Sequence, residues 1–164
     1  MRAYDTGRCS LGAVVVGWTD QGLGWASLGD DPEALVAELH EAWPDAVPTT
    51  GGVFLEAVVR GVDEGRSVEV PLDLEGTAFQ RRVWHALTEV PAGETVTYAG
   101  LARQLGSVAR AVGQACGQNR VAVAVPCHRA VRADGGLAGF RWGLERKRAL
   151  LARERGELGL FGSF

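Results

Sequence analysis

A cysteine, a histidine and an arginine stand in a row at Cys127, His128 and Arg129, directly after an apolar run and a proline. The run, residues 121–125, holds only small and β-branched residues, which is typical of a short buried strand. Pro126 has no backbone N–H, so it should end that strand and present Cys127 at its tip. A thiol beside an imidazole and a guanidinium is expected to have a lowered pKa and to act as a nucleophile. A buried structural cysteine next to a chance histidine would show the same short pattern.

The other two cysteines, Cys9 and Cys116, form no C-x-x-C pair with each other or with Cys127. An odd count without such a pair argues against a disulfide framework and against a cysteine-rich zinc site, and it predicts a reducing, cytoplasmic location. No apolar run approaches the roughly 20 residues that cross a bilayer, so no membrane contact is expected. The 164 residues fit one domain, or two small lobes that share a core.

Charge is divided unevenly along the chain. Residues 1–75 carry 4 basic and 14 acidic side chains, whereas residues 76–155 carry 13 basic and 5 acidic ones. Twelve of those 13 cations are arginine, whose guanidinium fork suits phosphates and base edges. The second half is therefore expected to present a nucleic-acid face, although a solvated basic surface would carry the same charges.

Residues 1–75 are predicted to form a structural α/β lobe with a three-stranded antiparallel sheet. Two strand-like stretches flank the Asp-Gln-Gly turn at 20–22 and predict a β-hairpin. One helix is expected to begin at Pro32, with Asp30 or Asp31 as its cap, and a second carries apolar residues at helical spacing from about residue 54. Alternating residues 68–74 predict the third strand. We find no catalytic cluster, phosphate loop or metal-ligand spacing in this half.

The second half is predicted to be mainly helical around a helix-turn-helix unit. Thr77 and Thr97 are expected to cap two helices, and the second of these, residues 98–105, is followed by a Gly-Ser turn. A further helix is predicted from Val108 to about residue 117. Arg110 lies early in this helix, at the place where such units meet nucleic acid.

Two further features follow the Cys-His-Arg segment. Residues 139–143 form an aromatic loop between glycines, which is unusual for a mere connector. Residues 144–155 predict a last helix that carries Glu154 between two arginines. Taken alone, Glu154 would be a surface ion-pair partner of little consequence for stability.

From Gly76 onward these patterns together resemble the O6-alkylguanine-DNA alkyltransferase family, especially the C-terminal half of the bacterial adaptive-response methyltransferase. The resemblance is carried by Gly76-Thr77-Ala78-Phe79-Gln80, Gly93-Glu94-Thr95-Val96-Thr97-Tyr98, Arg110-Ala111-Val112-Gly113, Asn119, Pro126-Cys127-His128-Arg129, Gly139-Phe140-Arg141-Trp142-Gly143, Lys147 and Glu154. It is strong over about residues 76–155 and weaker before them.

The resemblance implies a repair reaction without a cofactor. Cys127 would attack the alkyl carbon on guanine O6 and keep the alkyl group as a thioether, so each molecule would act once. His128 would be the base, acting through a water, and Glu154 would orient its imidazole. Asn119 would organise the turn that holds Cys127, and Tyr98 would donate its hydroxyl toward the guanine.

The resemblance also implies how DNA is held. A thiol cannot reach O6 inside a stacked duplex, so the base must be flipped out. Arg110 would fill the vacated space while its helix lies in the minor groove. The residues expected at DNA are Tyr98, Thr97, Arg110, Ala111, Gly113 and Arg129, and those expected around the substrate are Ala130, Phe140, Arg141 and Trp142.

The implied fold is a ribonuclease H-like α/β lobe, residues 1–75, followed by a winged-helix or helix-turn-helix lobe, residues 76–164. A monomer acting on double-stranded DNA is expected. Three other readings remain. A non-catalytic damage sensor of the same family would lack the cysteine. A helix-turn-helix transcription factor would leave the Cys-His-Glu set unexplained, and a cysteine hydrolase would need an oxyanion hole that nothing in the sequence marks.

Overall fold

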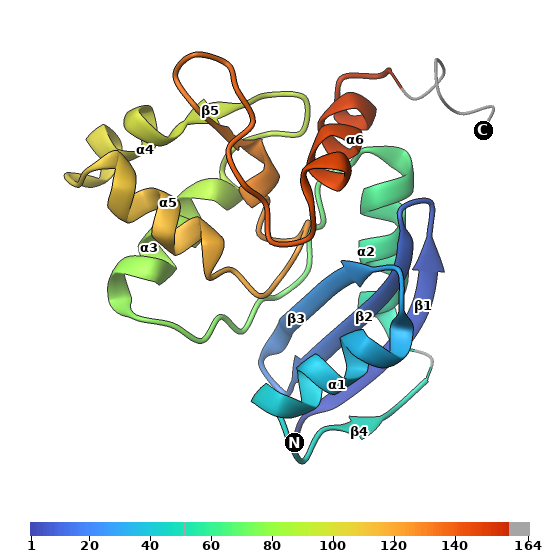
Figure 1. Cartoon of the computed structure of the whole chain (residues 1–164). Coiled ribbons are helices and arrows are strands. Elements are labelled where there is room, and N and C mark those ends of the chain that lie inside the picture. Colours follow the sequence, from blue (N-terminus) through green and yellow to red (C-terminus); the bar gives the residue numbers. More distant parts are fainter. Residues whose placement is uncertain (51, 158–164) are drawn as a thin grey trace.

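The computed structural model describes residues 1–50 and 52–157 (Figure 1). Its strands are β1 (Ala3–Cys9), β2 (Gly12–Thr19), β3 (Gly22–Gly29), β4 (Val47–Pro48), β5 (Val96–Thr97) and β6 (Ala130–Val131). Its helices are α1 (Pro32–Ala42), α2 (Val53–Glu64), α3 (Ala78–Thr88), α4 (Tyr98–Leu105), α5 (Ala109–Gly117) and α6 (Leu144–Glu154), with a short 3₁₀ turn, η1 (Cys127–Arg129). In the described part, no helix is both long enough and apolar enough to span a membrane.

The first half contains one sheet in the order β3-β2-β1-β4. The predicted hairpin of β2 and β3 is confirmed, but β1 pairs antiparallel with β2 and β4 adds two residues parallel to β1, so the expected three-stranded sheet has four strands. The strand predicted at 68–74 is wrong, since it makes only one bridge, between Leu72 and Leu23. Pro71 lacks an N–H and cannot continue a ladder, although its carbonyl accepts from the Leu23 N–H at 2.9 Å.

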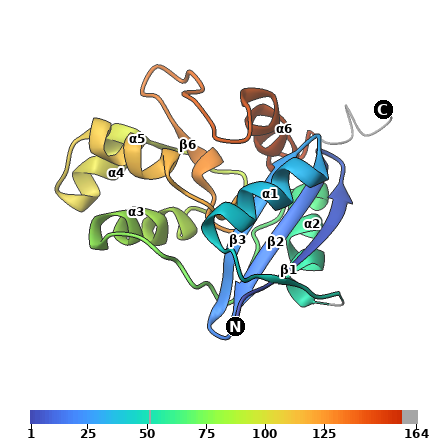
Figure 2. The same ribbon diagram turned by 60° about the horizontal axis from the view of Figure 1, so that its bottom comes forward.

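Helices α1 and α2 cover opposite faces of this sheet (Figure 2). Ala13 and Val15 of β2 pack in one apolar cluster with α1, whereas Val14 and Val16 pack in a second cluster with α2. Successive strand residues point to opposite faces, so a continuous apolar run here means burial on both sides. Of the two expected caps, Asp31 is the one that caps α1, and its side chain accepts a hydrogen bond from the Glu33 N–H at 3.0 Å.

Three helices of the second half, α3, α4 and α5, lie together beside the sheet (Figure 1). Thr77 and Gln80 form a reciprocal capping box at the start of α3, and Thr97 caps α4, both as predicted. Gly106 caps the C-terminus of α4, and its φ of 66° is the left-handed conformation that glycine adopts without strain. Three residues separate the end of α4 from the start of α5, so two short helices are joined by a tight glycine turn, as predicted.

The strand predicted at 121–125 is wrong, although all five residues are buried. Only Val121 makes a sheet-like bridge, to Ala26. Beyond it the chain coils: the Val125 N–H donates to the Val121 carbonyl at 3.0 Å, and Val123 has a φ of 72°. A left-handed φ is rare for a β-branched residue, so surrounding contacts must hold this turn. The apolar composition correctly indicated burial but not the conformation.

The two halves of the chain share one large apolar cluster. It contains Val14 and Val58 from the first half together with Leu101, Val112 and Leu150 from the second. The segment around residues 121–125 lies within the same cluster and contacts β3 through Val121. The turn that carries Cys127 is therefore embedded between the sheet and the helices.

Candidate active site

Cys127 begins the turn η1 and is 4 % exposed. Its thiol lines a cavity of about 610 Å³ between α4, α5 and the loop that follows β6. The cavity is lined by Tyr98, Ala99, Ala109, Arg110, Gly113, Cys116, Gly117, Cys127, Arg132, Ala133, Ala138, Gly139, Phe140 and Arg141. The structure thus brings four of the predicted segments to one cavity: the cysteine turn, both helices of the helix-turn-helix unit and the aromatic loop.

The environment of the Cys127 thiol favours its protonated form. Burial raises the pKa of Cys127 well above its ordinary value, and the neighbouring Cys116 thiol adds to this effect. A hydrogen bond from Asn119 and the charge of Lys147 act in the opposite direction but are outweighed. The expectation of a lowered pKa is therefore wrong, because burial dominates and the Arg129 guanidinium pairs with Glu154 instead.

Glu154 of α6 is the centre of a buried hydrogen-bond network. His128 Nε2 donates to Glu154 Oε2 at 2.7 Å, and the Arg129 guanidinium donates to both carboxylate oxygens at 2.9 and 2.8 Å. Burial opposes ionisation of Glu154, but these hydrogen bonds prevail and lower its pKa to about 2. The surface role that Glu154 would have in isolation is excluded, since its side chain is 1 % exposed.

His128 is arranged as a neutral imidazole. Burial lowers its pKa, although the hydrogen bond to Glu154 works against that shift. The Nε2 proton faces the Glu154 carboxylate, which leaves the lone pair on Nδ1. Nδ1 is buried, and within the described chain it has no hydrogen-bond partner. A buried, unpaired ring nitrogen is costly unless a water or a proton donor reaches it.

The predicted contact of Arg129 with DNA is wrong. Arg129 is 1 % exposed, and besides Glu154 its Nη1 donates to the Val90 carbonyl at 2.6 Å. In the described structure, the Arg129 side chain thus makes its hydrogen bonds inside the protein. Its charge stabilises the Glu154 carboxylate and cannot reach a phosphate at the surface.

Asn119 lies behind the cysteine turn and bonds to both ends of the coiled segment before it. Its Oδ1 accepts from the Val121 N–H at 2.8 Å, and its Nδ2 donates to the Val125 carbonyl at 3.0 Å. These bonds take the place of the sheet partners that the segment lacks. The side chain is buried.

Lys147 of α6 supports the opposite wall of the cavity. Its buried Nζ donates to the Ala130 carbonyl at 2.8 Å, to the Ala138 carbonyl at 3.3 Å and to Tyr98 Oη at 3.4 Å. Burial raises the pKa of Tyr98 to about 12, with a further contribution from the Cys116 and Cys127 thiols, so its hydroxyl keeps its proton.

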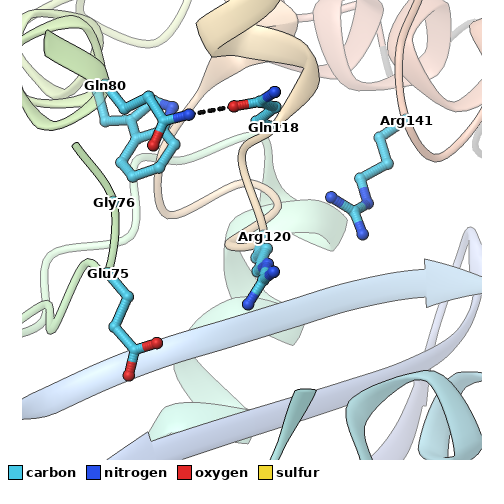
Figure 3. A pocket seen from close by; sticks show the side chains of 7 residues that line it. Glu75, Gly76, Gln80, Gln118, Arg120 and Arg141 are labelled. Atoms are coloured by element: carbon cyan, nitrogen blue, oxygen red, sulfur yellow. Dashed lines mark hydrogen bonds between the residues drawn. The ribbon is translucent and has the colours of Figure 1, made fainter. Parts of the chain in front are cut away.

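The aromatic loop supplies Phe140 and Arg141 to the cavity, but not Trp142. Trp142 is buried and packs edge-on against Phe140, with ring centroids 5.1 Å apart. The Arg141 guanidinium lies 3.1 Å from a carboxylate oxygen of Glu38 on α1 and also borders a second, polar pocket (Figure 3). Ala130 is likewise outside the cavity lining, and its carbonyl is occupied by Lys147.

The residues expected at DNA, apart from Arg129, lie on or near the helix-turn-helix unit. Arg110 is exposed at the start of α5 and lines the cavity together with Gly113. The Thr97 hydroxyl oxygen is engaged by the Gly100 N–H at 2.9 Å, and Ala111 is half-buried.

The chain is similar to known proteins of one family. The model for the DNA-binding domain of 6-O-methylguanine DNA methyltransferase matches residues 78–156. The methylated-DNA–protein-cysteine methyltransferase of Mycolicibacterium paratuberculosis is 53% identical over 120 residues, which cover 72% of this chain and 68% of that protein. The chain belongs to the O6-methylguanine DNA methyltransferase family.

Two further relatives define how far the similarity to this methyltransferase family extends. The Escherichia coli K12 bifunctional transcriptional activator/DNA repair enzyme Ada is 41% identical over 158 residues, covering 92% of this chain but 45% of Ada. The chain therefore spans less than half of that relative. The crystal structure of Mycobacterium tuberculosis OGT in complex with DNA superposes with a TM-score of 0.82 at 34% identity, covering 97% of this chain and 99% of that one. The α/β fold is thus that of known methyltransferase structures.

Two residues of this methyltransferase-family site were missed as functional residues in the sequence. Lys147 appeared there only as a matching position, yet it precedes the inward-facing Leu150 and Leu151 by one helical turn, which is a signal for a buried cation. Cys116 occupies the last turn of α5 and carried no signal of its own. Among the described residues, no group of three or more His, Cys, Asp or Glu side chains could hold a metal ion.

Proposed function

We propose that the protein repairs double-stranded DNA by moving an alkyl group from O6 of a flipped guanine to the sulfur of its own Cys127, once per molecule. The observation that carries this proposal is the placement of Cys127 in the lining of a cavity, directly before His128 in the chain. The buried pairing of His128 with Glu154 leaves Nδ1 without a hydrogen-bond partner among the described residues. Membership of the methyltransferase family agrees with it.

The proposed reaction begins with a proton transfer. Because burial raises the pKa of Cys127, the thiol is protonated at neutral pH and needs a base. The proton passes through one water to Nδ1 of His128, and the Glu154 carboxylate stabilises the imidazolium that forms. Such a water would also satisfy the buried nitrogen that is otherwise unpaired.

Alkyl transfer then exchanges one bond for another. The Cys127 sulfur attacks the alkyl carbon, a carbon–sulfur bond forms, and the carbon–oxygen bond to O6 breaks. The bonding electrons go to the guanine, which regains one proton in place of the alkyl group. Tyr98 would donate its hydroxyl proton to the departing purine, and its high pKa keeps that proton in place until it is needed. The proton that His128 took from Cys127 then restores the Tyr98 hydroxyl through solvent, so the protons balance. The thioether product is stable, so the reaction stops after one turnover.

The proposed DNA contact uses the helix-turn-helix unit, with α5 in the minor groove and Arg110 in the gap left by the flipped base. Thr97, Ala111 and Gly113 would lie at this surface, and the exposure of Arg110 beside the cavity supports the arrangement. Backbone N–H groups near Phe140 and Arg141 would recognise the O6 side of the base.

We further propose a division into a structural lobe, residues 1–75, and a DNA-binding and acceptor lobe, residues 76–164. A ribonuclease H-like description of the first lobe is supported by its antiparallel β1–β3 core with helices on both faces. A winged-helix description of the second is supported by the pairing of β5 with β6 beside α4 and α5.

A damage sensor that flips the base without reacting is the competing function. The presence of Cys127 at the cavity, followed in the chain by the buried His128–Glu154 pair, argues against that alternative. A transcription factor would not require the buried His128–Glu154–Arg129 network.

A transfer assay tests the proposal. Duplex DNA carrying a radiolabelled methyl group on guanine O6 is incubated with an excess of protein, and the label in the protein is counted. We expect complete transfer at excess protein and, with DNA in excess, a plateau at one label per protein molecule. Tight binding of the modified duplex with no label in the protein would support the sensor instead.

A further inference from the structure

Cys116 is a second thiol in the acceptor cavity, and the proposed reaction does not use it. It lies in the last turn of α5, whereas Cys127 begins η1, and both side chains line the same cavity. Both are largely buried, at 9 % and 4 % exposure. Cys9 lies outside this cavity, on β1.

The two thiols line the same cavity, and the Cys116 thiol contributes to raising the pKa of Cys127 after burial, which agrees with their being neighbours. Asn119 ties the segments that carry them together: its backbone N–H donates to the Cys116 carbonyl at 3.2 Å, and its side chain donates to the Val125 carbonyl at 3.0 Å. The same residue therefore tethers both segments whose thiols line the cavity. A disulfide forms where the two Cα atoms lie within about 7 Å and the sulfurs can close to about 2.05 Å with a torsion of about 90°.

The cavity also gives a small oxidant access to this pair. Its volume of about 610 Å³ far exceeds that of a peroxide, and its rim includes the exposed Arg110 and Arg132. The cavity must admit a purine if the proposed function is correct, so a smaller polar molecule can enter it as well.

We propose that Cys116 is a resolving cysteine, which forms a reversible disulfide with Cys127 when the protein meets hydrogen peroxide. One thiolate attacks a peroxide oxygen, the O–O bond breaks, and the released hydroxide takes up a proton to become water. The sulfenic acid that results is attacked by the second sulfur; the S–S bond forms, the S–O bond breaks and a second water leaves. Two thiols and one peroxide thus give one disulfide and two waters.

The disulfide would switch the acceptor off without destroying it. The Cys127 sulfur could not attack an alkyl carbon until a thiol reductant broke the disulfide. This consequence rests on the proposed function. A Cys127 without a partner would instead continue to sulfinic and sulfonic acids, which thiols do not reduce. For a protein whose acceptor sulfur is used only once, this protection preserves the whole molecule.

Mass spectrometry of peroxide-treated protein tests the inference. We expect the reduced wild-type chain to lose the mass of two hydrogens, to yield a linked peptide pair containing Cys116 and Cys127, and to regain its original mass with dithiothreitol. Cys116→Ser and Cys116→Ala should instead gain oxygen atoms on Cys127 that dithiothreitol leaves in place. Cys9→Ser is the matched control and should form the link as the wild type does.

The inference is overturned if wild type forms no Cys116–Cys127 link and its Cys127 gains oxygen as fast as in the two Cys116 variants. A separate readout is the transfer of the labelled methyl group from DNA to the protein. It is measured on the same samples before oxidation, after oxidation and after reduction. A wild type that forms the link but never transfers a label would contradict the proposed function while leaving the disulfide established. Loss of transfer on oxidation and its recovery on reduction would support both.

Discussion

Nε2 of His128 lies 2.7 Å from Oε2 of Glu154, and both side chains are shielded from solvent. This contact fixes which ring nitrogen carries the proton and leaves Nδ1 as the basic nitrogen. Arg129 secures the carboxylate from the other side at 2.8 Å. The order of residues in the Pro-Cys-His-Arg segment therefore has a physical basis. Cys127 lines the cavity, and the imidazole and the guanidinium that follow it are joined by one carboxylate.

Replacing Glu154 by glutamine should weaken both the fold and the reaction. The amide would leave the buried Arg129 charge without its counter-ion, which typically costs about 3–5 kcal/mol in the free energy of unfolding. Urea denaturation measures this loss. Glu157→Gln is the matched control, because its pairing with Arg155 is at the surface and should leave the urea midpoint unchanged. Equal midpoints for the two variants would contradict a buried network.

Acid should destabilise the wild type more than the Glu154 variant. The pKa of Glu154 is about 2 in the folded protein against an ordinary 4.5, so the unfolded chain takes up the proton first as the pH falls. The resulting stabilisation, about 3 kcal/mol, is complete above pH 4.5 and disappears between about 4.5 and 2. Thermal unfolding across this window should show a steeper loss for wild type than for Glu154→Gln; parallel curves would exclude this contribution.

His128→Gln should slow transfer by about 10²–10⁴-fold, the usual contribution of a general base. Since burial lowers the pKa of His128, the wild-type rate should hold its plateau as the pH drops through 6.5 and fall only at lower pH. The single-turnover rate on methylated duplex, measured from pH 8 downward, gives this profile. His85→Gln, on the last turn of α3, is the control. A rate that already halves at pH 6.5 would contradict a buried neutral imidazole.

Lys147→Met should loosen the cavity wall while keeping the length of the side chain. Three oxygen acceptors, including Tyr98 Oη, would lose their donor, at a cost of about 1–3 kcal/mol for each buried group left unpaired. Hydrogen exchange should increase in residues 130–140. Arg148→Met, on the exposed face of α6, should leave both stability and exchange unchanged. Unaltered exchange in Lys147→Met would show that Lys147 does not anchor this wall.

Arg110→Ala should separate base flipping from chemistry. Arg110 lies at the exposed start of α5 and not at the Cys127–His128 pair, so attack on free O6-benzylguanine should be retained while repair of the methylated duplex slows. Arg103→Ala, at the exposed end of α4, provides a control of equal charge. If Arg110→Ala loses activity equally on both substrates, Arg110 has no role specific to flipping.

Local signals predicted the helices of this protein well. The caps at Asp31, Thr77 and Thr97 act within a few residues, so sequence alone reveals them. The apolar run at 121–125 predicted burial correctly, but its conformation depends on hydrogen bonds from the Asn119 side chain and on a bridge to β3. Such partners are set by the tertiary fold and leave no periodic trace in the run itself.

The residues of the candidate site, too, could be predicted from the sequence only in part. Residue type and order predicted the Cys-His-Arg segment, and the family resemblance predicted the role of Glu154. The direction of Arg129 was not predicted, because only the packing of α6 decides that it meets Glu154. Trp142 and Ala130 lie close in sequence to cavity residues but turn into the core. Neighbours on a short turn diverge, so sequence adjacency could not assign their faces.

The most direct measurement is a peptide map of the protein after reaction with O6-methylguanine duplex. The peptide that contains Cys127 should carry the mass of one added CH₂ group in every protein molecule that has consumed a lesion, and Cys127→Ser should consume none. A methyl group on Cys116, on Cys9 or on no residue, with the lesion nevertheless removed, would contradict Cys127 as the acceptor.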